Sequence, residues 1–133
     1  MRIWPLCILL FALPALGGAP PPPSVHQLPP AVQNEWRKIA DGWMQQEFSK
    51  ALRHARFKMS CGGCKSLYLA VELSIDQEGH ATAASAVEQP GPGCKRPPSH
   101  LKRSLLHYLK KVRFPEALRS RSFSARIGTA LMC

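Results

Sequence analysis

The chain has 133 residues, a length that allows one domain and little else. Its hydrophobic content of 45% and its three tryptophans argue against a disordered chain. The formal net charge of +10 predicts attraction to anionic surfaces such as nucleic acid, acidic lipid or cell-wall polymers, without choosing among them.

Residues 1–18 have the pattern of a signal peptide. Arg2 gives a short positive region, residues 3–16 form an apolar run, and small residues follow. Pro5 and Pro14 interrupt this run, which is shorter than the roughly 20 apolar residues that a membrane-spanning helix needs. We therefore expect a cleaved leader, a periplasmic or secreted protein, and no transmembrane span in the mature form. An uncleaved N-terminal anchor is the alternative.

A proline-rich segment follows the leader. Residues 19–30 read "APPPPSVHQLPP", in which six of twelve residues are proline. This composition predicts an extended, semi-rigid linker that reaches about 35 Å. We expect the folded domain to occupy residues 31–133.

The domain is predicted to begin with a helix from residue 31 to about residue 56. Apolar residues recur there at three- and four-residue spacing, and we expect this stripe to pack on its own domain. Gly42 is predicted to mark a kink or a break into two helices. The stripe consists of Val32, Trp36, Ile39, Trp43, Met44, Phe48, Ala51, Leu52 and Ala55.

The next segment changes to a two-residue period. Residues 67–75 alternate between apolar and polar side chains, which predicts a half-buried strand. A tight turn is expected at residues 76–79, with Gly79 suited to a positive φ. Residues 80–87 should return as the antiparallel partner, and residues 88–98 form a rigid loop.

A second helix and a third strand complete the predicted domain. Residues 99–114 have one apolar face and one basic face, and Pro115 ends the helix. Residues 122–132 alternate again and predict a strand. The expected fold is α+β, with a small three-stranded antiparallel or mixed sheet in the order 2-1-3, packed by one or two helices.

The order of these motifs resembles the C-terminal domain of TonB and TolA-type proteins, in particular the short variants found on gliding-motility proteins. The resemblance covers about residues 44–133. It depends on "LYLAVELSIDQEGHATAASAV" at 67–87, on "LKKVRFP" at 109–115 and on the strand "SFSARIGTALM" at 122–132. The helix "FSKALRHARF" at 48–57 is similar to that of the gliding-type members.

This resemblance implies a non-enzymatic protein-interaction module of the cell envelope. TonB-like domains bind an extended protein or peptide partner by pairing it with a sheet edge. The family has no catalytic residues, so the resemblance assigns neither a catalytic, cofactor-binding nor metal site to this chain. Without a secure membrane anchor, and with so short a tether, we expect a stand-alone module rather than an energy transducer.

Four cysteines outside the leader are expected to form disulfides. An even number of cysteines in a small exported chain is typical of disulfide bonding. The predicted topology brings all four to one end of the sheet, and the hairpin places Cys64 opposite residues 91–94. Cys64–Cys94 is then a natural pair and Cys61–Cys133 the other, although the sequence alone allows three connectivities.

Two chemical alternatives use Cys61 and Cys64. A thiol-disulfide oxidoreductase would use this C-x-x-C pair, but here the pair precedes a strand, and its glycines disfavour the helix N-terminus that activates a thiol. A zinc site could use all four thiolates, but the second two-cysteine motif is missing, because Cys94 and Cys133 are far apart in the sequence.

A third alternative uses the positive charge. The helix at 99–114 could bind an anionic envelope polymer or lie on a membrane surface, although the sheet needs this helix as a cover. No recognition motif supports specific nucleic-acid binding, and the export signal argues against it. The candidate basic surface consists of Lys102, Arg103, Lys110, Lys111 and Arg113.

Overall fold

The structure, a computed structural model, describes residues 20–95 and 99–133. The predicted signal peptide lies outside the described residues. The helices and strands are η1 (Val25–Gln27), α1 (Pro30–Trp43), η2 (Met44–Phe48), α2 (Ser49–His54), β1 (Ser66–Ile75), β2 (Ala81–Pro90), α3 (Ser99–Lys111), η3 (Glu116–Leu118) and β3 (Ser122–Ala130).

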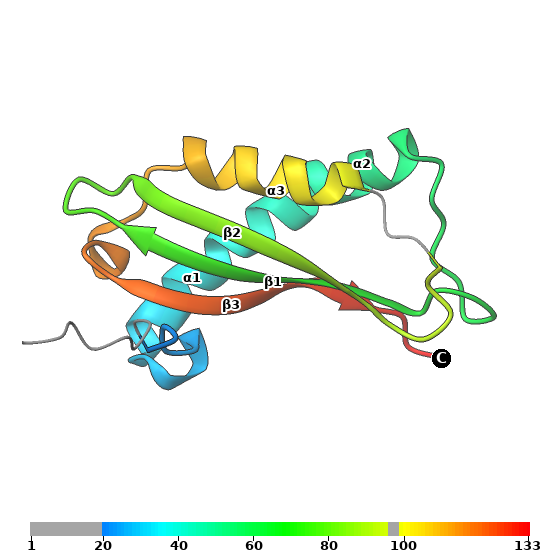
Figure 1. The fold of residues 1–133 in the computed structure, drawn as a ribbon, viewed down its shortest axis with the longest axis horizontal. Coiled ribbons are helices and arrows are strands. Elements are labelled where there is room, and N and C mark those ends of the chain that lie inside the picture. The colour runs from blue at the N-terminus through cyan, green and yellow to red at the C-terminus, as the bar shows by residue number, and fades with distance from the viewer. Residues whose placement is uncertain (1–19, 96–98) are drawn as a thin grey trace, which may run out of the picture.

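The three strands form one sheet in the order β2-β1-β3, which confirms the predicted topology. Both β2 and β3 pair with β1 in the antiparallel sense, so that Tyr68 at the centre lies between Gln89 and Gly128. Figure 1 shows the helices on one face of the sheet, with α3 running along β2. The fold is therefore α+β with two layers, as expected.

The core lies between the sheet and the helices. Alternate residues of β1 are buried on this face, as the two-residue period predicts. The predicted stripe of the first helix packs on its own domain from Val32 to Leu52, with Trp43 fully buried, whereas its last member, Ala55, is exposed. The largest fully buried side chains are Trp43, Phe114, Phe123, Leu67, Leu69, Leu101, Leu105, Leu109, Leu118 and Val71.

The N-terminal helical region departs from the prediction at Gly42. The α1 helix passes through Gly42 without a break, and the irregularity is a π-helical turn at η2, which leads into α2. Gly42 is small because a Cβ there would collide with the Tyr108 hydroxyl. That hydroxyl donates a hydrogen bond to the Ile39 carbonyl oxygen at 2.9 Å. Gly42 therefore permits close packing of α1 against α3.

Part of the expected linker belongs to the fold. Val25 is only 3% exposed and is part of the hydrophobic core. The preceding residue, Ser24, forms a parallel bridge with Ser124 of β3. The prediction of a linker over 19–30 is thus wrong for its second half, because burial of Val25 depends on a contact with a strand about a hundred residues later.

The ends of three other elements also differ from the predictions. The α3 helix ends at Lys111, because the Phe114 N–H donates to the Gly79 carbonyl at 2.8 Å instead of continuing the helix. Strand β2 continues to Pro90, and β3 ends at Ala130. In the described part of the chain, no helix is both long enough and apolar enough to cross a membrane.

Candidate functional site at an open sheet edge

The outer edge of β3 is the part of the sheet that is best placed to bind another strand. The Leu131 N–H donates to the Lys65 carbonyl oxygen at 2.7 Å, which shows that odd-numbered residues at this end of β3 hydrogen-bond to β1. In an antiparallel pair, the intervening residues direct their N–H and C=O groups away from the partner strand. These residues are Ser122, Ser124, Arg126, Gly128 and Ala130.

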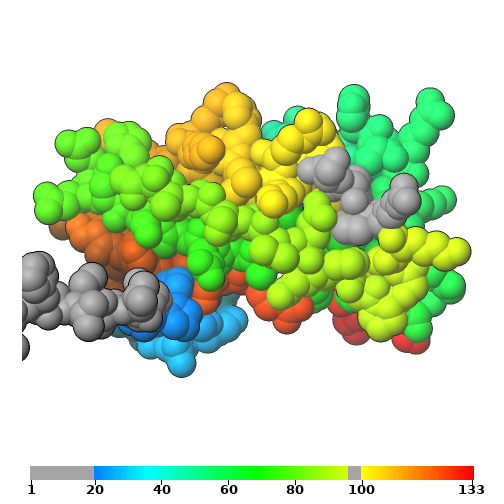
Figure 2. All heavy atoms as spheres, viewed as in Figure 1, coloured from blue at the N-terminus to red at the C-terminus, as the bar shows by residue number. Residues whose placement is uncertain are grey.

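The N-terminal segment already covers the first half of this edge. The Ser124 N–H donates to the Pro23 carbonyl oxygen at 2.8 Å, and Ser24 forms its bridge at the same point. In Figure 2 the blue atoms of this segment lie against the orange atoms at the start of β3, whereas orange-red atoms further along stay visible at the lower rim. Among the described residues, the outward backbone groups of residues 126–130 make no hydrogen bond. We call this stretch the open edge.

The other edge of the sheet, along β2, is less accessible. The Gly91 N–H donates to the Ser66 carbonyl at 2.9 Å, so the even-numbered residues of β2 direct their backbone groups outward. The α3 helix lies along this strand, and Ala86 is only 2% exposed. A helix beside an edge and a proline at its end, here Pro90, both hinder strand addition.

Side chains next to the open edge form a small platform on the uncovered face of the sheet. The Arg126 guanidinium carbon lies 4.4 Å from the centre of the Tyr68 ring, a cation–π contact. Its Nε donates to Gln89 Oε1 at 3.1 Å. The platform of Arg126, Tyr68 and Gln89 therefore crosses all three strands and ends at the open edge.

Gly128 makes the packing of this platform possible. A Cβ at this position would overlap the Leu67 carbonyl oxygen and lie 2.6 Å from the Tyr68 Cα. The Tyr68 ring covers the space that the missing Gly128 side chain leaves. Aromatic rings commonly cover glycines of edge strands in this way. A side chain from a strand added at the open edge would therefore meet an aromatic surface at this position.

Two disulfides link the chain at the end of the sheet where β3 ends. Cys61 bonds to Cys133 and Cys64 bonds to Cys94, with Cα–Cα distances of 5.9 and 4.4 Å. The expected pairing is confirmed. The first bond fixes the chain that leaves the open edge, because Cys133 follows β3 by three residues.

The disulfide pairing bears directly on the two cysteine alternatives. A redox-active C-x-x-C motif joins its own two cysteines, whereas here each of them bonds to a distant cysteine. All four sulfur atoms are also used in covalent bonds, which leaves no thiolate for zinc in the oxidised protein.

The five predicted basic residues lie on α3 and just beyond its end. All of them are exposed. Lys111 lines one hollow beside η2 and Arg103 lines a second, adjoining one, whereas Lys102 and Lys110 line neither. Arg113 lies beyond the end of α3, and its Nε donates to the Glu78 carbonyl oxygen at 3.3 Å. Arg103 and Lys111 are thus the members of the predicted set that line a hollow.

Sequence reasoning missed a cluster of metal-ligand types at the hairpin turn. Asp76, Glu78 and His80 bring one ligand atom each to within 4.8 Å of the others. The pattern D-x-E-x-H was its signal in the sequence. Asp76 Oδ1 already accepts the N–H groups of Glu78 and His80, each at 2.9 Å. The N–H of His80 above all lowers the pKa of the Asp76 carboxyl below 3.8, so this carboxylate stabilises the turn.

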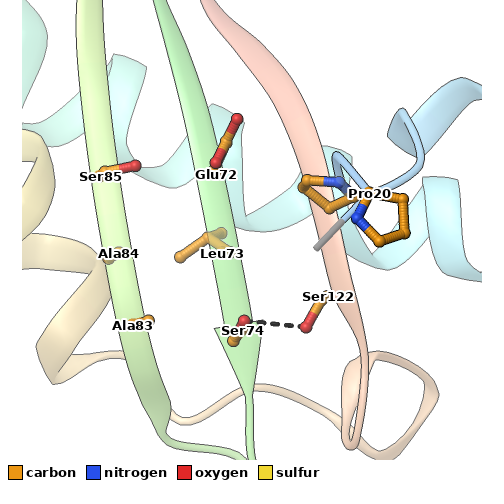
Figure 3. Close-up of a pocket in the computed structure, with 9 residues that line it drawn as sticks. Pro20, Glu72, Leu73, Ser74, Ala83, Ala84, Ser85 and Ser122 are labelled. Carbon is orange, nitrogen blue, oxygen red and sulfur yellow. Dashed lines mark hydrogen bonds between the residues drawn. The ribbon is translucent and has the colours of Figure 1, made fainter. Parts of the chain in front are cut away.

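The uncovered face also has a shallow hollow of about 380 Å³ near the hairpin turn. Figure 3 shows Pro20 beside it and the hydrogen bond between Ser74 and Ser122, whose hydroxyl oxygens are 2.8 Å apart. Its lining consists of serine, alanine and proline residues and Leu73, with Glu72 as the single charged group. This composition offers small hydroxyl groups without a paired acid and base.

Comparisons with known proteins give no relative for this chain. The sequence matches no protein-family model, and neither the curated proteins nor the solved structures give a significant match.

Proposed function

We propose that this protein is an exported, non-enzymatic binding module that takes up an extended segment of a partner protein at the open edge of β3. The partner strand would hydrogen-bond to the outward N–H and C=O groups of Arg126, Gly128 and Ala130. Main-chain hydrogen bonds of this kind supply affinity without a fixed partner sequence.

The observation that carries this proposal is the difference between the two halves of one edge. At Ser124 the edge already accepts a strand-like segment of the chain itself, through the Pro23 carbonyl. Residues 126–130 continue the same edge in the same register with β1. A partner peptide would therefore extend an interaction that the fold already uses.

The platform gives the proposed site a means of selecting its partner. A strand added beside Gly128 places alternate side chains on the uncovered face of the sheet, next to Tyr68 and Arg126. Arg126 is exposed and in contact with an aromatic ring, so it favours aromatic or acidic side chains at this position. The TonB-like resemblance of the sequence supports the same mode of binding.

The proposed location outside the cytoplasm depends on the disulfides. Two bonds that involve all four cysteines outside the leader are typical of proteins that fold in an oxidising compartment. Together with the signal-peptide pattern of residues 1–18, they support a periplasmic or secreted protein.

The proposal can be tested by selecting peptides from a random twelve-residue display library on the oxidised protein, then measuring the selected peptides by calorimetry. Arg126→Pro removes an outward N–H without touching the hydrogen bonds to β1 and should abolish binding. Arg126→Ala keeps the N–H and is the matched control, with a loss of roughly three- to tenfold from the side chain alone. Circular dichroism checks that both variants fold.

A second measurement separates strand addition from other binding modes. N-methylation of alternate peptide residues should abolish binding in one register and leave it unchanged in the other, because only every second N–H faces β3. Equal binding of all N-methylated peptides, or full binding by Arg126→Pro, would contradict the proposal.

A further inference from the structure

A second surface lies in the helix layer and is independent of the open edge. The hollow between η2 and α3 measures about 400 Å³ at one end, and a second, adjoining hollow of about 650 Å³ continues it toward α2. Both hollows are lined by Glu47, Ser104 and His107. In Figure 1, α2 and the start of α3 lie side by side at this end of the molecule.

Two cations and two histidines are among the side chains that line this groove. Lys111 lines the first hollow, and His100 and Arg103 line the second. These three residues lie on one side of α3. They are spread over about 16 Å along the helix, since each residue of a helix rises about 1.5 Å. His54 of α2 faces His100 with its ring centre 5.2 Å away.

Little in the described structure neutralises this charge. Neither α2 nor α3 contains an acidic residue, so Glu47 is the one carboxylate that lines either hollow. Among the described residues, Arg103 and Lys111 make no ion pair within 4.0 Å. The groove therefore holds several cationic or hydrogen-bond-donating groups whose charge is available to a ligand.

We propose that this groove binds a linear, phosphate-bearing polymer of the cell envelope, such as a polyol-phosphate chain. A phosphate group has more acceptor oxygens than a carboxylate and can accept from several donors at once. Arg103, Lys111, the imidazoles and the Ser104 hydroxyl form such a set of donors along a line rather than at one point. A chain of repeated phosphates matches this linear arrangement.

The surroundings of the groove favour a dissolved polymer over a bilayer. Within the described residues, the large exposed apolar side chains are Val87, Leu131 and Met132, none of which lies on α2 or α3. A helix that enters a membrane surface needs an exposed apolar face, which this layer does not have. The disulfides support the proposed location outside the compartment that holds most nucleic acid.

The test uses the oxidised full chain and a synthetic poly(glycerol phosphate) of fixed length as the probe, titrated at low and high salt. The double variant Arg103→Gln/Lys111→Gln should bind roughly tenfold more weakly, the loss expected for two charge-assisted contacts. The control Arg37→Gln/Lys102→Gln removes the same charge from residues that do not line either hollow, and should lose less than about twofold. Binding should weaken as salt rises.

A variant that is expected to strengthen binding complements these losses, because an unfolded protein would not bind more tightly. Glu47→Gln removes the carboxylate from the groove and should strengthen binding by about two- to fivefold. Glu116→Gln changes the net charge equally at η3 and should have little effect.

Four outcomes would overturn the proposal. These are an absence of binding to the probe, equal losses in the two double variants, equal or tighter binding to a polygalacturonate of matched charge, and tighter binding to duplex DNA or anionic vesicles. The peptide titrations of the open edge should be unchanged in Arg103→Gln/Lys111→Gln, so the two proposals can fail separately.

Discussion

The two ends of the sheet are held together by different means. At the hairpin end, the buried Gly79 accepts the Phe114 N–H at 2.8 Å, and the Asp76 carbonyl accepts the Ser120 N–H at 3.2 Å. The turn, the end of the α3 segment and the start of β3 are thus joined by backbone hydrogen bonds. This end is closed without a covalent link.

At the opposite end the chain is largely exposed between α2 and β1, and disulfides take the place of a core. Residues 55–63 include no buried side chain, and Cys64 is the first buried residue after Ala51. Two disulfides connect this loop to the end of β3 and to the loop after β2. The comparison teaches that a small domain can leave one end of its sheet exposed to solvent beside a free strand edge. At that end, disulfides provide the stability that buried apolar surface provides elsewhere.

The largest expected effect comes from removing a disulfide. Cys64→Ala/Cys94→Ala should lower the free energy of unfolding by about 3–4 kcal/mol, since the bond closes a loop of thirty residues. Cys61→Ala/Cys133→Ala, across 72 residues, should cost about as much or slightly more. Urea denaturation under oxidising conditions measures both. Losses below about 1 kcal/mol would show that the core alone stabilises this end.

The hairpin end should be sensitive to a single methyl group. Gly79 has a φ of +90°, and a Cβ there would lie 2.5 Å from the Phe114 carbonyl oxygen. Gly79→Ala should therefore lower the free energy of unfolding by roughly 2–3 kcal/mol. The matched control is Gly62→Ala at the cysteine end, where a Cβ meets no atom within 4 Å. Equal effects of the two substitutions would remove the distinction between the ends.

A hydroxyl group in the helix layer should have a smaller effect. Tyr108→Phe removes the hydrogen bond to the Ile39 carbonyl and should cost about 1 kcal/mol by thermal or urea denaturation. The control is Tyr68→Phe on the uncovered face, because the Tyr68 hydroxyl makes no hydrogen bond to any described residue. A loss in the control as large as that in Tyr108→Phe would contradict the assignment.

The smallest effect concerns pH. The N–H of His80 lowers the folded-state pKa of Asp76 below 3.8, so the contribution of this carboxylate is present near neutral pH. It is lost as pH falls below 3.8 through the lowered folded-state pKa. The melting temperature of the parent protein should therefore fall more steeply below that pH than that of Asp76→Asn. Parallel curves for the two proteins would show that the turn does not depend on this charge.

Local patterns predicted most of this fold correctly. The two-residue period of β1 and the turn at 76–79 determined the hairpin, and the return through a helix determined the order 2-1-3. Once the hairpin register was known, the pairing of Cys64 with Cys94 followed from position. These features depend on residues that are close in the sequence or joined by one short connection.

The features that the sequence did not predict depend on distant contacts. Val25 lies in a proline-rich segment and has no periodic neighbours, so only its contact with β3 shows that it is buried. The same contact divides the β3 edge into a covered and an open half. The groove of Arg103 and Lys111 likewise requires the position of η2 relative to α3, which no single helix pattern contains.

The measurement that tests the open edge most directly is amide hydrogen exchange along β3 in the free, oxidised protein, followed residue by residue by NMR. The N–H of Ser124 and those of Ile127 and Thr129 should be protected, whereas those of Arg126, Gly128 and Ala130 should exchange rapidly. This alternating pattern is the result that the account predicts. Uniform protection from residue 124 to residue 130 would mean that another segment or a second copy already covers the edge, and would contradict it.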